Sequence, residues 1–190
     1  MKKILATTLL LAIFTSSAFA EVTKYNLDPN HTNVTWHANH FGFSNPSGKF
    51  NEVSGFANLD LKNPKTSAVE VTIKTDSINT GITKFDAHLK SADFLNVEKF
   101  PTAKFVSKKV IVTGKNTAKV EGELTLAGVT KPLTLNVTLN KSGTHPFTQK
   151  PTVGFSAKAT IVRSEYGINY GIPGVSDKVA LDIETEASVE

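Results

Sequence analysis

The sequence predicts an all-β protein whose antiparallel sheet forms either a closed barrel or a sandwich, with one short helical insertion. Apolar and polar residues alternate along most of the chain, as they do in strands with one buried face. No helical segments separate successive strands, as βαβ units would require, so the strands run antiparallel. The stretch from Phe85 to Phe105 breaks the alternation and is helical and aromatic in character.

The segment TNVTWHANH shows the alternation clearly, because Val34, Trp36, Ala38 and His40 share one face of the expected strand. Further inward-facing residues are Val69, Val71, Ile73, Val120, Leu124, Leu126, Leu133, Leu135, Val137, Leu139, Phe155, Ala157, Ala159, Ile161, Val179, Leu181 and Ile183. With weaker runs elsewhere, we expect about nine strands joined by turns such as NPSG and KSG.

The first 20 residues, MKKILATTLLLAIFTSSAFA, have the pattern of a signal peptide: a basic start, a short apolar run and an A-x-A cleavage site. The apolar run is too short to span a bilayer, and no other segment is long enough. We therefore expect residues 21–190 to form one soluble barrel domain in the periplasm of a Gram-negative bacterium.

The composition argues against several classes of protein. The chain has no cysteine, which excludes lipid attachment to a thiol, a disulfide framework and a thiolate metal site. Without Lys2 and Lys3 the formal net charge falls from +4 to +2, and no run of Lys and Arg indicates a nucleic-acid partner. Lys119, Glu121 and Glu123 occupy an outward face, and one lipid-facing Lys costs about 2 to 4 kcal/mol, so an outer-membrane barrel is excluded.

The interrupting stretch predicts a short helix. Thr83 is a candidate N-cap with Asp86 three residues later, and Pro101 keeps the helix from running into the next strand. One face would carry Phe85, His88, Leu89 and Ala92. The helix either plugs one end of the barrel and completes the core, or forms a lid whose apolar side chains contact a ligand.

Several segments resemble the YceI-like family of bacterial lipocalin-like proteins. They are DAHLKSADFLNVEKFPTAKF, LTLAGVTKPLTLNV, HTNVTWHANHFGFSNPSGKF, VEVTIKTDSINTG and IVRSEYGI, which together extend the resemblance over the whole mature chain. The resemblance implies a lipocalin-like antiparallel barrel of about eight strands that binds polyisoprenoid chains, such as quinone or prenyl tails, or fatty-acid derivatives. It also implies a possible homodimer. SEYG stands where the family more often has SDFG, so Glu165 and Tyr166 enlarge and polarise that corner.

The inward residues themselves leave the state of the interior open. Ala157 and Ala159 either make room for bulky neighbours or leave a cavity, and a barrel of about eight strands permits both. Arg163 shares the inward parity, so we expect it to pair with a carboxylate or to lie near a wet mouth where it binds a ligand head group. The candidate ligand-binding residues are Trp36, His40, Phe85, Leu89, Phe94, Phe105, Phe155, Ala157, Ala159, Ile161, Arg163 and Tyr166.

We predict a periplasmic binding or carrier protein for a polyisoprenoid, quinone-like or fatty-acid-derived lipid, with no catalytic residues, no metal and no cofactor. His31, His37 and His40 are the nearest metal-ligand cluster, but the last two fall on opposite faces of a regular strand. A nucleophile elbow of the G-x-S-x-G type is absent. The alternatives are a solidly packed structural or stress-related barrel without lipid, and a hydrolase.

Overall fold

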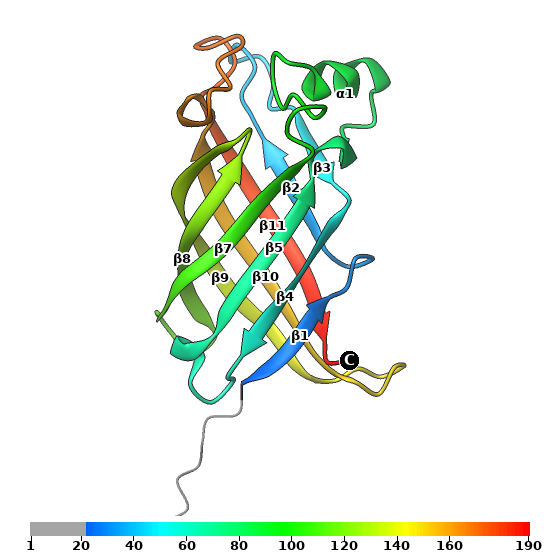
Figure 1. The fold of residues 1–190 in the computed structure, drawn as a ribbon, viewed down its shortest axis with the longest axis vertical. Coiled ribbons are helices and arrows are strands. Elements are labelled where there is room, and N and C mark those ends of the chain that lie inside the picture. The colour runs from blue at the N-terminus through cyan, green and yellow to red at the C-terminus, as the bar shows by residue number, and fades with distance from the viewer. Residues whose placement is uncertain (1–21) are drawn as a thin grey trace, which may run out of the picture.

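A computed structural model describes residues 22–190, and the predicted signal peptide at residues 1–20 lies outside the described residues. The described chain forms one sheet of eleven strand segments (Figure 1). The strands are β1 (Thr23–Leu27), β2 (Asn33–His37), β3 (Ser47–Phe50), β4 (Val53–Leu59), β5 (Ala68–Lys74), β6 (Ile78–Asn79), β7 (Thr102–Val112), β8 (Thr117–Leu126), β9 (Val129–Thr144), β10 (Pro151–Val162) and β11 (Lys178–Ser188). The helices are α1 (Thr83–Lys90) and the short 3-10 turns η1 (Pro64–Thr66), η2 (Thr75–Ser77) and η3 (Arg163–Tyr166).

The sheet is an antiparallel meander that closes on itself. From β7 onward each strand pairs with the next, and the free edge of β11 pairs with both β1 and β2. Leu27 lies opposite Ala187 and Asn33 lies opposite Glu184, so β1 and β2 follow one another along the same edge. The closed barrel, one of the two architectures that the sequence left open, is therefore confirmed.

The eleven segments form a barrel wall of eight strands, since three of the wall strands are each interrupted once and count as two segments. β3 pairs with β2 while β4 pairs with β1, and β6 pairs with β3 while β5 pairs with β4. β1 and β2 therefore form one wall strand with a break, β3 and β4 form a second, and β5 and β6 form a third. The nine strands expected from the alternation thus correspond to eleven segments and eight wall strands.

The alternation of residues along the strands gives the sheet an apolar inner face and a charged outer face. Val34, Trp36, Val120 and Leu124 are buried along the inside of the barrel. On the outside, Lys and Glu of adjacent strands pair, as in the 2.6 Å contact between Nζ of Lys104 and a carboxylate oxygen of Glu70. Exposed pairs of this kind add little stability, so burial of the inner face holds the barrel together.

Phe105 of β7 relies on a glycine in the neighbouring strand. Its ring lies over Gly122 of β8, on the inner side of the barrel wall. A Cβ added at Gly122 would lie 2.5 Å from Cζ of Phe105 and closer still to the carbonyl oxygen of Val106. Only glycine leaves room for this aromatic ring.

Helix α1 covers one end of the barrel, as Figure 1 shows. Leu89 is buried, and Phe85 meets Trp36 edge to face with 6.1 Å between ring centroids. The helix is confirmed, but its predicted cap is wrong: Thr83 is the first helical residue, and Asp86 accepts hydrogen bonds from the amide and the hydroxyl of Thr80 at 2.7 and 2.6 Å. Asp86 reaches back to Thr80 because the chain turns sharply at Gly81 before the helix begins. Within residues 22–190, no helix is long and apolar enough to cross a membrane.

We predict that Gly122→Ala destabilises the barrel by about 1 to 3 kcal/mol, because the new methyl group must displace the Phe105 ring or the backbone of β7. Urea unfolding followed by circular dichroism measures this difference. The matched control is Gly154→Ala in β10, where an added Cβ meets no atom within 4 Å. Equal stability of the two variants would contradict the packing role of Gly122.

Candidate ligand-binding cavity

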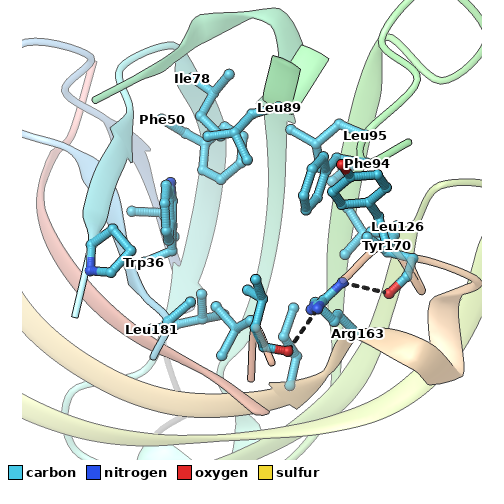
Figure 2. A pocket seen from close by; sticks show the side chains of 18 of the residues that line it. Trp36, Phe50, Ile78, Leu89, Phe94, Leu95, Leu126, Arg163, Tyr170 and Leu181 are labelled. Atoms are coloured by element: carbon cyan, nitrogen blue, oxygen red, sulfur yellow. Dashed lines mark hydrogen bonds between the residues drawn. The ribbon is translucent and has the colours of Figure 1, made fainter. Parts of the chain in front are cut away.

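The end of the barrel under α1 encloses a cavity of about 240 Å³, which we call the α1-end cavity. Aromatic and aliphatic side chains from the barrel wall, from α1 and from the loop after η3 face each other across it (Figure 2). The labelled lining residues are Trp36, Phe50, Ile78, Leu89, Phe94, Leu95, Leu126, Arg163, Tyr170 and Leu181. Arg163 and Tyr170 lie on the side opposite Trp36, and most of the other lining side chains are apolar.

A second cavity of about 440 Å³ occupies the opposite half of the barrel, and we call it the basal cavity. Its wall consists mainly of Val, Leu, Ile and Ala side chains from the strands, such as Val53, Leu135 and Ile183. The basal cavity reaches the surface among loop residues that include Leu61 and Lys115.

The two cavities meet at a ring of four side chains. Val34 of β2, Ile73 of β5, Leu124 of β8 and Leu181 of β11 line both of them. We call this ring the waist. Because all four side chains are aliphatic and come from four different strands, the two cavities lie next to each other along the barrel with only apolar side chains between them.

Arg163 is the one buried guanidinium in the described chain, with 4 % of its surface exposed. Its Nε donates to the carbonyl oxygen of Ser176 at 2.9 Å, and Nη1 and Nη2 donate to the carbonyls of Ile168 and Val175, both at 3.0 Å. Figure 2 shows it at the cavity wall. Arg163 therefore holds the 163–177 loop in place.

The predicted carboxylate partner of Arg163 is not found. Asp177 is near enough to oppose the lowering of the Arg163 pKa that burial causes, yet it forms no ion pair with the guanidinium. Asp177 instead accepts from the amide and hydroxyl of Ser164 at 2.9 and 2.7 Å, and these bonds lower its pKa. Backbone carbonyls replace the expected carboxylate because the loop curls around the side chain.

Trp36 has a buried hydrogen-bond donor without a partner. Its Nε1 is the only buried side-chain polar atom within residues 22–190 that makes no hydrogen bond. Trp36 is 7 % exposed and lines the α1-end cavity. Leaving such a donor unsatisfied costs about 1 to 3 kcal/mol, which the burial of the indole ring has to offset.

The structure places ten of the twelve predicted ligand-binding residues on a cavity wall. The α1-end cavity is lined by Trp36, His40, Phe85, Leu89, Phe94, Ile161 and Arg163, and the basal cavity by Phe105, Phe155 and Ala157. Ala159 and Tyr166 are buried but line neither cavity. Their burial is core packing, and burial raises the pKa of the Tyr166 hydroxyl.

Some lining residues escaped the sequence reasoning. Tyr170 packs against the rings of His88 and Phe94, with centroid distances of 5.0 and 5.2 Å, and completes the wall opposite Trp36. It comes from the glycine-rich loop after η3, where no periodicity indicates which side chain turns inward. His40, predicted to end a strand, lies beyond β2 and forms isolated bridges with Ser44 and Val175 at the rim.

The histidines do not gather as the metal hypothesis required. His37 pairs on the outer surface with Asp182 at 3.1 Å, and His31 lies beside Asp28 and Glu186 at the break between β1 and β2. These last three offer ligand atoms within 4.8 Å of one another. They line neither cavity, so this group stands apart from the ligand site.

A closed antiparallel barrel of eight wall strands with apolar cavities inside it defines a lipocalin-like class of fold. The comparison with known proteins agrees, because residues 25–187 match the model of the YceI-like domain. The chain belongs to the YceI-like family.

Relatives and solved structures support this assignment. A UPF0312 protein of Pseudomonas putida (strain W619) is 38 % identical over 188 residues, which cover 98 % of this chain and 97 % of the relative. The crystal structure of a Campylobacter jejuni YceI protein has a TM-score of 0.71 at 30 % identity, over 80 % of this chain and 89 % of that one. A polyisoprenoid binding domain from Saccharophagus degradans has a TM-score of 0.67 at 16 % identity, over 90 % and 100 % of the two chains, and shows the shared fold.

We predict that Arg163→Met lowers the free energy of unfolding by about 3 kcal/mol, because one buried and two partly buried carbonyl groups lose their donor. Chemical denaturation measures the loss. Lys158→Met is the control, since its 2.6 Å ion pair with Asp182 is exposed and exposed ion pairs contribute little to stability. A loss at Arg163 no larger than that of the control would rule out its structural role.

A pH dependence follows from the contact between Nδ1 of His31 and Oδ2 of Asp28 at 2.7 Å. The hydrogen bond raises the pKa of His31 and lowers that of Asp28. The histidine contribution to stability is complete below its unfolded pKa of about 6.5 and is lost as the pH rises through the folded value. The aspartate contribution is present above its unfolded pKa of about 3.9 and is lost as the pH falls.

Asp28→Asn should therefore lower the pKa of His31 in an NMR titration. It should also destabilise the protein more at pH about 5.5 than at pH about 9, where the neutral imidazole no longer gains from the carboxylate. An unchanged His31 titration, or a stability difference independent of pH, would show that the contact carries no coupling.

Proposed function

We propose that this protein binds and carries a polyisoprenoid or a similar long-chain amphiphile inside its barrel. The observation that carries the proposal is the pair of adjacent apolar cavities that share the waist. A long flexible chain that parts the waist side chains would fill both cavities, whereas a compact polar metabolite would leave its own polar groups unsatisfied there. The YceI-like family membership and the likeness to a polyisoprenoid binding domain support the same class of ligand.

The tail of the ligand can supply the affinity. At about 0.3 kcal/mol per heavy atom, a chain with about 30 enclosed carbon atoms gains about 9 kcal/mol, which corresponds to a dissociation constant below 1 μM. No head-group contact is required for this affinity. Quinone-like and fatty-acid-derived lipids therefore belong to the same proposal.

The head of the ligand belongs at the α1 end. Arg163 uses three of its five N–H groups on backbone carbonyls, and the Nε1 donor of Trp36 has no partner. Both residues line the α1-end cavity. An acceptor oxygen of the ligand, such as a carbonyl, hydroxyl or phosphate oxygen, would satisfy the two remaining N–H groups of Arg163.

Binding fits this cavity better than catalysis. His40 and His88 are the imidazoles on its wall, and within residues 22–190 no hydroxyl group is hydrogen-bonded to either ring. A nucleophile with its general base is thus not assembled there. The signal-peptide pattern at residues 1–20 adds that the carrier acts after export, as one domain in the periplasm.

Organic extraction of the protein purified from its native host, followed by mass spectrometry, tests the proposal directly. A long-chain amphiphile at about one molecule per barrel is the expected result. Uptake by the delipidated protein can be followed through Trp36, which is the single tryptophan of the chain and lines the cavity. A protein that carries no lipid and takes up no prenol would instead be a structural barrel.

Filling the basal cavity should shorten the chains that bind. We predict that Ala157→Trp weakens binding of a prenol of about 40 carbons at least tenfold, because the indole occupies the space of the buried tail. A prenol of about 10 carbons, which fits the α1-end cavity alone, should bind as before. Thr160→Trp, on the exposed face of the same strand, is the control. An equal loss of affinity for the long and the short prenol would contradict a role of the basal cavity in binding the tail.

A further inference from the structure

The end of the barrel opposite α1 gathers lysines that lie far apart in the sequence. We call it the basal end, and it consists of the loop between β4 and β5, the loop between β7 and β8, and the end of the β9–β10 hairpin from residue 141 to residue 150 (Figure 1). The basal lysines are Lys62, Lys65, Lys115, Lys141 and Lys150. All five are exposed, and none belongs to an ion pair within the described chain.

Acidic side chains do not balance this charge. Asp60 is the one acid within the three loops, and it is 2 % exposed and accepts from the backbone amides of Lys62 and Asn63 at 2.9 and 2.8 Å. Glu190 lies at the same end and is hydrogen-bonded to Asn26 at 2.7 Å, and Glu186 of β11 lies level with Lys141 because both are opposite Gly154. The solvent-facing charge of the basal end is therefore predominantly positive.

Apolar side chains stand exposed among the same lysines. Phe147 projects from the β9–β10 loop with 89 % of its surface exposed, and Leu61 and Val112 are 45 and 40 % exposed. Exposed apolar side chains interspersed with Lys are the pattern of surfaces that lie in the headgroup region of a bilayer, where the ammonium groups meet phosphates and the apolar tips enter the acyl boundary.

The basal cavity opens within this surface. Leu61, Pro64 and Lys115 belong both to the basal loops and to the cavity wall. The α1 end also exposes Phe41 and Phe43, but acidic residues such as Glu98 and Glu165 are mixed with its lysines. Charge complementarity to an anionic surface thus favours the basal end.

We propose that the basal end docks onto the anionic surface of a phospholipid bilayer, with the mouth of the basal cavity facing the lipid. This inference rests on the proposed function, because docking there brings the cavity to the phase from which a lipid ligand is taken or to which it is delivered. The phosphate groups of the bilayer are the chemical partners of the lysines.

Co-sedimentation with vesicles tests the docking surface. The full mature protein should bind vesicles containing equal parts of phosphatidylglycerol and phosphatidylcholine, and binding should weaken as NaCl rises to about 1 M, where the Debye length falls to about 3 Å. Lys62→Gln, Lys65→Gln, Lys141→Gln and Lys150→Gln combined should weaken binding at least about tenfold. Phe147→Ser should weaken it further.

A matched variant tests whether the location of the lysines, rather than the net charge of the protein, determines vesicle binding. Lys49→Gln, Lys84→Gln, Lys131→Gln and Lys178→Gln remove the same charge away from the basal end, and none of these lysines lines a cavity. This variant should bind the anionic vesicles within about twofold of the unchanged protein. Equal losses in the two variants, or no binding of the unchanged protein to anionic vesicles at low salt, overturn the proposal.

Prenol uptake in detergent, without vesicles, distinguishes failure of docking from failure of lipid binding. The four basal substitutions leave the cavity lining unchanged, so Trp36 fluorescence should report the same prenol affinity in both variants. Uptake of prenol without vesicle binding overturns the docking proposal alone. Vesicle binding through the basal lysines without prenol uptake supports docking and overturns the carrier function.

Discussion

Closure of the sheet along β11 is the constraint on which the interior depends. β11 pairs over its whole length with β10 on one edge and, on the other, with β2 and then β1. An open sheet of this length would leave backbone donors and acceptors unpaired and would expose the apolar face that the alternation creates. Once the edge is paired, every inward side chain faces the same enclosed space, so the cavity is a product of closure.

The barrel remains hollow because of the sizes of the inward side chains. In the basal cavity only Phe105 and Phe155 are aromatic, and the other apolar lining residues are aliphatic or small. Aromatic side chains concentrate instead at the α1 end, where Trp36 and Phe85 meet below the helix. The helix therefore acts both as a plug for that end and as part of the cavity wall, which joins the two roles that the sequence left as alternatives.

The sequence predicted the features that depend on local pattern. The alternation identified inward residues such as Trp36, Leu124 and Phe155 because a strand repeats every two residues whatever its partners are. The location of the helix followed from its own periodicity. Its cap did not, since Thr83 has the residue type of a cap but lies inside the helix, and the cap position is occupied by Ile82, whose side chain makes no hydrogen bond.

Features that depend on the closed shape of the barrel could not be predicted from the sequence. The guanidinium of Arg163 donates to backbone carbonyl groups up to 13 residues away in the chain. Every residue has a backbone carbonyl, so the sequence does not indicate which ones accept. Tyr170 turns inward from an irregular loop in the same way. The basal lysines form no run in the sequence, and they become a cluster only because an antiparallel barrel brings alternate loops to one end.

The waist has a consequence for the rate of ligand exchange. Val34, Ile73, Leu124 and Leu181 belong to the wall strands, so they cannot swing aside as a lid does. A chain that passes between them leaves lengthwise, and each withdrawn carbon gives up about 0.3 kcal/mol of contact before the head is free. Residence time should then grow steeply with chain length, and rapid delivery would need an acceptor that holds the emerging end while the remainder follows.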